Sequence, residues 1–130
     1  MNLVADTHAL VWYLSGELRR LGRRARHAFA QADSARWTVR VPSVVLMEIV
    51  LLEQRGRIRL SYRELREQLA IRPGLPIEPL TAEDIDEARA LAVLSDPFDC
   101  LIAGTAKRLD LPLITNDAAI TKTGLVPTHW

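Results

Sequence analysis

Apolar runs and stretches of helical spacing alternate along the chain. Short apolar or β-branched runs at residues 3–5, 37–41, 75–80 and 111–115 are typical of strands, and residues 124–130 are a further edge-strand candidate. Between them, apolar side chains recur every three or four positions, which indicates helices. The alternation predicts an α/β fold, a three-layer αβα sandwich around a central parallel sheet of four or five strands, in one domain over residues 1–130.

Several predicted helices carry recognisable start and stop signals. Ser61 and Glu64 form a capping box, and Ser43 is placed to cap a helix that runs to about residue 54 and ends at Gly56. This second helix is apolar on almost every side, which predicts that it is buried.

The clearest helix start lies at Asp96. This residue occupies the N-cap position, Pro97 is the first helical residue, and Asp99 falls in the first turn. Both carboxylates therefore lie at the positive end of a buried helix. They either only stabilise that end, by about 1 kcal/mol each, or they also line a functional site.

Three further acids stand at unusual places. Asp6 and Asp117 each follow an apolar strand, where parallel sheets bind ligands, although Asp6 also fits a helix N-cap. Glu48 lies inside the apolar helix, where an ionised carboxylate costs several kcal/mol unless an arginine or a cation neutralises it.

These acids are expected to meet at one edge of the sheet. Two carboxylates about 4 Å apart repel by roughly 4 kcal/mol at an effective dielectric constant near 20, so a shared pocket requires a cation. Oxygen ligands suit Mg²⁺ or Mn²⁺, ions that activate water and orient phosphodiesters. The pattern therefore favours metal-assisted phosphodiester hydrolysis.

Composition adds less than the pattern does. A net charge of +1 over 130 residues does not by itself indicate a nucleic-acid-binding protein. The basic residues are unevenly spread, however, and an apolar stripe through residues 18–32 predicts one helix with arginines on its opposite face. That face is either solvated or contacts RNA through Arg19, Arg20, Arg23, Arg24 and Arg26.

The remaining chemistry is sparse. A single cysteine, Cys100, excludes an internal disulfide and is interpreted as a small packing residue. His8 is interpreted as a helix-surface histidine, and Trp12 and Tyr13 as packing or dimer surface. The start of the chain lacks a charged and apolar leader, and the longest apolar run is too short to span a bilayer. We therefore expect a cytoplasmic protein without membrane contact.

The ordered set of motifs resembles one family. Over almost its whole length the chain resembles the PIN-domain ribonucleases. Within that family it is similar to the VapC toxins of bacterial VapBC toxin–antitoxin pairs. It rests on Asp6-Thr7, Ser43 with Glu48, Asp96-Pro97-Phe98-Asp99 and Thr115-Asn116-Asp117.

The resemblance implies a PIN-like fold and a site with assigned roles. Asp6, Glu48, Asp99 and Asp117 would be the catalytic, metal-binding acids, with Asp96 and Thr115 supporting them. It also implies Mg²⁺ or Mn²⁺ as cofactor, an RNA substrate, a homodimer, and a VapB-type antitoxin as inhibitor. This chain has Leu94 and Cys100 where relatives often carry histidine and arginine, which bears on substrate positioning.

Two other functions compete with a metal-dependent endoribonuclease. Acids at strand ends with Mg²⁺ also serve phosphoryl transfer through an aspartyl-phosphate intermediate. Alternatively, the chain is a non-catalytic PIN-like interaction module whose acids bind basic segments of a partner.

Overall fold

A parallel sheet forms the centre of the protein, which we describe from a computed structural model covering Met1 to Trp130. Its four strands lie in the order β3-β2-β1-β4. They are β1 (Asn2–Ala5), β2 (Thr38–Pro42), β3 (Ile77–Glu78) and β4 (Leu113–Ile114). The predicted αβα sandwich with a parallel sheet is confirmed.

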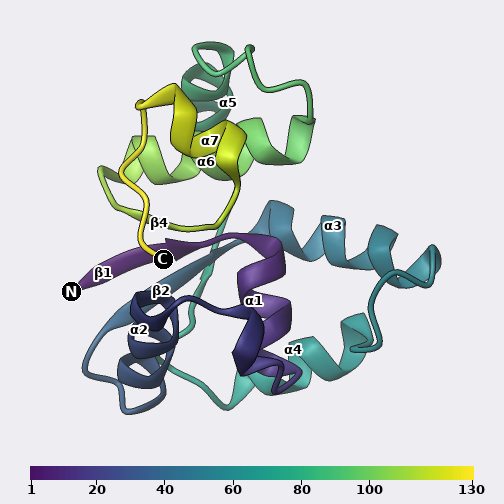
Figure 1. The fold of residues 1–130 in the computed structure, drawn as a ribbon. Helices are drawn as coiled ribbons and strands as arrows, with labels where there is room; N and C mark the ends of the chain where they lie inside the picture. Colours follow the sequence, from purple (N-terminus) through teal and green to yellow (C-terminus); the bar gives the residue numbers. More distant parts are fainter.

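Helices cover both faces of the sheet (Figure 1). One side carries α1 (Thr7–Leu14), α2 (Arg23–Asp33) and α4 (Tyr62–Ala70), and the other carries α5 (Ala82–Arg89), α6 (Pro97–Leu109) and α7 (Ala118–Thr123). Helix α3 (Ser43–Gln54) leaves the carboxyl end of β2 and packs against α1 and α6, so it connects the two layers. None of these helices combines the length and apolar character that crossing a membrane requires.

The strand order reverses next to β1. The chain adds β2 and β3 on one side of β1 and then returns to place β4 on the other side, so that Val4 pairs with both Arg40 and Leu113. At such a switch point the loops after the two strands diverge and leave a crevice at the carboxyl edge of the sheet. Asp6 follows β1 and Thr115 follows β4 at this crevice.

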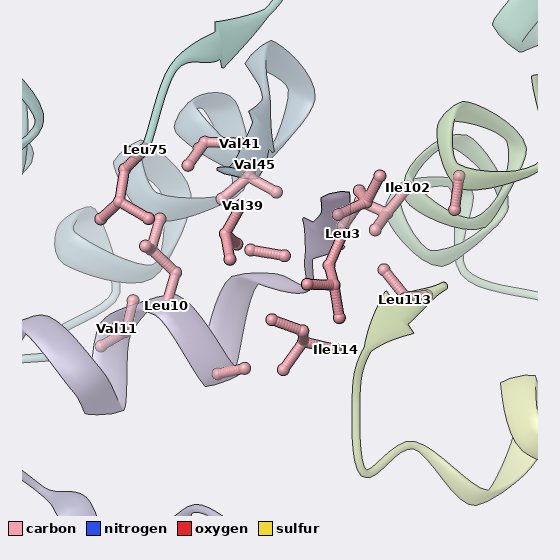
Figure 2. Packing of buried hydrophobic residues seen from close by; sticks show 14 of the residues in the cluster. Leu3, Leu10, Val11, Val39, Val41, Val45, Leu75, Ile102, Leu113 and Ile114 are labelled. Atoms are coloured by element: carbon pink, nitrogen blue, oxygen red, sulfur yellow. The ribbon is translucent and has the colours of Figure 1, made fainter. Parts of the chain in front are cut away.

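Strands β1 and β4 are apolar because both faces of the sheet are buried there. Strand β2 instead alternates buried and half-buried residues, and β3 is not buried. A parallel sheet covered by helices on both sides has continuous apolar strands rather than an alternating pattern. Figure 2 shows how side chains of the sheet meet those of the flanking helices. The labelled residues, all buried, are Leu3, Leu10, Val11, Val39, Val41, Val45, Leu75, Ile102, Leu113 and Ile114.

The predicted helix through residues 18–32 is wrong, because the structure divides it. A 3₁₀ turn at Leu18–Arg20 is followed by extended backbone at Leu21, and α2 begins only at Arg23. At Gly22 the backbone packs so tightly on Trp130 that a β-carbon would lie 2.6 Å from the backbone of Trp130. The helix is interrupted at this contact.

Three smaller predictions also need correction. Ser43 is the first helical residue rather than the cap, and its hydroxyl accepts a hydrogen bond from the amide of Leu80 at 3.0 Å. The helix it starts is not fully buried, because Met47 is 50% exposed. The edge strand at residues 124–130 amounts to one bridge, between Leu113 and Thr128.

Candidate active site

Asp6 is held by hydrogen bonds from two elements at the carboxyl edge of the sheet. It caps α1, and one carboxylate oxygen accepts from the amide of Thr7 at 2.6 Å. The other oxygen accepts from the hydroxyl of Thr115, also at 2.6 Å. Because Thr115 follows β4, this bond spans the switch point and fixes the direction of the Asp6 carboxylate.

Thr115 also connects Asp6 to Asp117. Its buried hydroxyl accepts a hydrogen bond from the amide of Asp117 at 3.1 Å while donating to Asp6. Asp117 caps α7 through the amide of Ile120 at 3.1 Å. One threonine therefore sets the relative position of two of the predicted site acids.

Glu48 reaches the same crevice from α3. Thr7 donates its hydroxyl proton to a carboxylate oxygen of Glu48, so the residue next to Asp6 orients this third acid. None of the ion pairs in the structure includes Glu48. The arginine partner that would explain this half-buried carboxylate structurally is therefore not present.

Asp96 and Asp99 occupy the start of α6, as the sequence indicates. Asp96 accepts hydrogen bonds from the amides of Phe98 at 2.8 Å and Asp99 at 3.2 Å, with Pro97 as the first helical residue. Asp96 is thus a true N-cap. Its carboxylate holds the first turn in place, and that turn carries Asp99.

The electrostatics show that these acids share one region. Burial raises the pKa of Asp99 from 3.8 to about 7, with further contributions from the charges of Asp96, Asp117, Asp6 and Glu48. These charges, one from the same helix start and three from other segments, are near enough to Asp99 to oppose its ionisation. That the acids converge on one shared site stays a prediction.

Asp6 and Glu48 are likewise difficult to ionise. Burial raises the pKa of Asp6, although hydrogen bonds from Thr115 and Thr7 partly oppose it. Burial also raises the pKa of Glu48, the hydrogen bond from Thr7 opposes this, and the charge of Asp6 adds to it. The neighbouring His8 side chain partly opposes both increases in pKa. The protein thus supplies little positive charge to offset the ionisation of these acids.

The donor set suits a hard divalent cation. Every site acid offers oxygen, and mutual repulsion makes the pocket attractive to a positive ion. No three Asp, Glu, His or Cys side chains are drawn tightly enough together to ligate one ion in this structure. The acids therefore suit the ion by the type of donor atom, while their present spacing does not form a complete ligand set.

The arginines predicted to contact RNA do not form one surface. The guanidinium of Arg20 lies over the ring of Trp12, 4.4 Å from its centroid. Arg23 and Arg24 instead line a separate hollow of about 410 Å³ that contains Trp37. Arg19 and Arg26 are exposed and line neither.

Two residues beside the acids were missed as site residues. His8 and Trp12 line a hollow of about 200 Å³ together with Asp6 and Asp117. The signal was available in the sequence, because residues four apart on a helix that starts at Asp6 lie on one face. Thr7, which orients Glu48, was noticed only as part of a motif.

The positions that depart from the family pattern are used for packing. Leu94 is buried, and the thiol of Cys100 donates towards the carbonyl oxygens of Leu91 at 3.4 Å and Leu94 at 3.1 Å. Burial and the charges of Asp99 and Asp96 raise the pKa of this thiol, which opposes a nucleophilic role.

Comparisons with known proteins give a consistent result. The family model of the PIN domain matches residues 3–125. No curated protein sequence matches this chain significantly. Among solved structures, the fold is similar to VapBC2 from Rickettsia felis bound to promoter DNA, with a TM-score of 0.73 at 16% identity over 98% of this chain and 97% of that one.

Two further solved structures have the same fold. DNA-bound VapBC from Salmonella typhimurium gives a TM-score of 0.69 at 17% identity, covering 98% of this chain and 96% of that one. VapC20 from Mycobacterium tuberculosis, a toxin that cleaves the sarcin-ricin loop, gives 0.63 at 21% identity and covers both chains fully. At these identities the likeness establishes the fold.

Proposed function

The chain belongs to the PIN domain family, and we propose that it is a metal-dependent endoribonuclease acting as the toxin of a toxin–antitoxin pair. The observation that carries this proposal is the placement of Asp6, Glu48 and Asp117 at one edge of the sheet by hydrogen bonds with Thr7 and Thr115. Burial raises the pKa of Asp99, which lies near enough to these acids for their charges to raise it further. Asp6, Glu48, Asp99 and Asp117 would hold Mg²⁺ or Mn²⁺. That ion supplies a more acidic water and offsets charge on the phosphodiester.

The chain's own residues prepare the site for this reaction. Thr115 fixes Asp6 and Asp117 relative to each other, and Thr7 fixes Glu48. Asp96 holds the first turn of α6 and so places Asp99. In the proposed reaction water attacks phosphorus and the bond from phosphorus to the 3′ oxygen breaks. The products then carry 5′-phosphate and 3′-hydroxyl ends.

The partners follow from the same relatives. Solved structures with this fold include VapBC complexes from two bacteria, and a toxin–antitoxin complex from Klebsiella pneumoniae, similar at 21% identity. These support a VapB-type antitoxin as the partner of this chain. We also propose a homodimer that acts on RNA in the cytoplasm.

The hydrogen bonds at Asp6 argue against an aspartyl-phosphate intermediate. Both carboxylate oxygens of Asp6 accept hydrogen bonds from the protein, one from Thr7 and one from Thr115. A nucleophilic carboxylate needs one oxygen directed at phosphorus. We therefore expect no phosphorylated Asp6 to be trapped with phosphate donors; a phosphorylated Asp117 would favour the competing mechanism.

The test is cleavage of defined RNAs with Mg²⁺ or Mn²⁺, or with EDTA, followed by analysis of the product ends. Wild type should cleave only with the ion, and Asp99→Asn should abolish cleavage. Asp110→Asn is the matched control, because Asp110 lies at the opposite end of α6. Cleavage in EDTA, or 2′,3′-cyclic phosphate ends, would contradict the proposal. No cleavage of any RNA would favour the non-catalytic interaction module.

A further inference from the structure

A second hollow lies beside the acids. It has a volume of about 680 Å³ and runs along α1 between the 3₁₀ turn at Leu18–Arg20 and the segment that follows α3. Three arginines line it, Arg20, Arg57 and Arg59. Of these, only Arg20 belongs to the arginine-rich segment seen in the sequence.

The two hollows are neighbours that share two lining residues. His8 and Trp12 line both the larger hollow and the smaller one that contains Asp6 and Asp117. Both side chains project from α1, one turn apart, immediately after the residue that carries the first acid. An extended chain lying in the larger hollow would therefore meet these two rings at the end of the hollow nearest Asp6 and Asp117.

Arg57 and Arg59 present their charges to this groove. In the sequence Arg57-Ile58-Arg59-Leu60 the apolar side chains are half-buried or buried, while both arginines are exposed. Neither arginine takes part in an ion pair. Two unpaired guanidinium groups on the same wall form a site for groups that accept two hydrogen bonds each, such as phosphates.

Arg20 and Trp12 add a flat surface at the junction. The Arg20 guanidinium lies over the Trp12 ring, 4.4 Å from its centroid, and the Arg20 side chain is still 58% exposed. Its contact with Glu17 is 3.7 Å long and exposed, so this ion pair is weak. A guanidinium plane held in this way can stack on a nucleobase and donate in-plane hydrogen bonds to a phosphate.

We propose that this groove binds the single-stranded segment of RNA that leads to the acidic cluster, with Arg57 and Arg59 on its phosphates and Arg20, stacked on Trp12, beneath a base. The inference rests on the proposed function for the direction of the strand. It deepens that function by naming the binding surface and the form of the substrate.

An acidic peptide is the other ligand that three arginines would attract. Glu17 and Glu64 also line the groove, and the groove adjoins a pocket that holds Asp6 and Asp117. Peptide carboxylates gain nothing from reaching that pocket. A phosphodiester would gain the attraction of a divalent ion bound in that pocket. Only RNA would also use the stacking surface.

The test measures binding of a short 5′-labelled RNA of mixed sequence by fluorescence anisotropy, over a series of salt concentrations. All variants are made in the Asp99→Asn background so that the probe stays intact. Arg57→Ala and Arg59→Ala should each weaken binding several-fold and reduce the slope of log affinity against log salt by about 0.7. Arg20→Lys should weaken binding with little change in that slope, because it keeps the charge and loses the plane.

Arg55→Ala is the matched control. Arg55 is exposed, lies two residues from Arg57 and does not line the groove, so its variant should bind like the parent protein. Unchanged binding by Arg57→Ala and Arg59→Ala would overturn the proposal, as would an equal loss with Arg55→Ala. Tighter binding of a polyglutamate peptide than of RNA would also overturn it.

Cleavage separates this inference from the proposed function. In the otherwise wild-type protein, Arg57→Ala and Arg59→Ala should raise KM several-fold with little change in kcat, because they bind the strand away from the reacting bond. Wild type that binds RNA through the groove and never cleaves it would refute the nuclease alone. Cleavage that is insensitive to all three arginines would refute the groove alone.

Discussion

Replacing Asp99 by asparagine should stabilise the ligand-free protein, which is unusual for an acid at the start of a helix. In the folded protein the Asp99 carboxylate is half-buried among other carboxylates, and its pKa is raised from 3.8 to about 7. Each pKa unit corresponds to about 1.4 kcal/mol. The full difference therefore amounts to about 4 kcal/mol, as an upper bound for the destabilisation by the ionised group.

The measurable effect is smaller because Asp99 is only half-buried. Screening by water and relaxation of the neighbouring acids reduce the expected gain to about 1–2 kcal/mol. A purely capping role gives the opposite sign, since the helix dipole favours an ionised first-turn acid by about 0.3–1 kcal/mol. The two explanations of Asp99 thus differ in sign as well as in size.

The pH dependence follows from the raised pKa. A carboxyl group whose pKa is higher in the folded state contributes stability that is present below pH 3.8 and is lost as the pH rises through about 7. Wild type should therefore lose stability between about pH 4 and pH 7, and Asp99→Asn should lose less. The advantage of the variant is then larger at pH 8 than at pH 5.

Urea unfolding in EDTA at these two pH values measures the difference. Asp110→Asn serves as the control for loss of one charge on the same helix, and because it keeps Asp99 its stability should fall as the pH rises, as that of wild type does. Adding Mg²⁺ should stabilise wild type more than Asp99→Asn, because only wild type keeps the full ligand set. If Asp99→Asn is less stable than wild type at both pH values, the acids are capping groups and the shared-site interpretation of Asp99 fails.

Three other substitutions separate scaffold from site. Asp84→Asn should lower the free energy of unfolding by about 2–4 kcal/mol in chemical denaturation, because the buried Asp84 pairs with Arg108. The affinity for Mn²⁺ should be unchanged, and a weaker affinity would show that Asp84 also contributes to the ion site. Gly104→Ala should destabilise by about 1–3 kcal/mol in thermal melts, because its β-carbon would lie 2.6 Å from the backbone oxygen of Asp84; a neutral result would mean that α5 and α6 separate easily. Thr115→Val should reduce RNA cleavage at least about tenfold at constant helicity, because Asp6 and the amide of Asp117 both lose their partner; full activity would show that Thr115 does not orient the acids.

Local signals explain why the sequence predicted so much of the fold. The α6 start was predictable because Asp96, Pro97 and Asp99 each obey a positional rule of helix N-termini. The capping box of Ser61 and Glu64 forms as expected. The buried parallel strands follow from apolar runs, which need only short-range information.

Non-local contacts explain what the sequence did not predict. The break of the helix at Gly22 depends on Trp130, which lies more than a hundred residues away along the chain. The strand order, and hence the switch point, is decided by packing that no local pattern records. Arg57 and Arg59 were overlooked because only the fold brings them to the groove that adjoins the pocket of Asp6.

The candidate site likewise combines features that local sequence signals predicted with features that depend on non-local contacts. Asp6, Glu48, Asp99 and Asp117 were identified from their positions in predicted elements and from the family resemblance. Their connection through Thr7 and Thr115 became visible only in three dimensions. The missing arginine partner of Glu48 likewise required the structure, because charge pairing depends on distance rather than on sequence.

Binding of Mn²⁺ tests most directly whether acids from distant parts of the chain hold one common ion. Electron paramagnetic resonance of a Mn²⁺ titration should show binding by wild type and an affinity lower by about tenfold or more in Asp6→Asn, Glu48→Gln, Asp99→Asn and Asp117→Asn. Asp110→Asn should bind like wild type. Wild-type affinity in Asp6→Asn or Glu48→Gln, or no binding by the unmodified protein, would contradict a shared metal site.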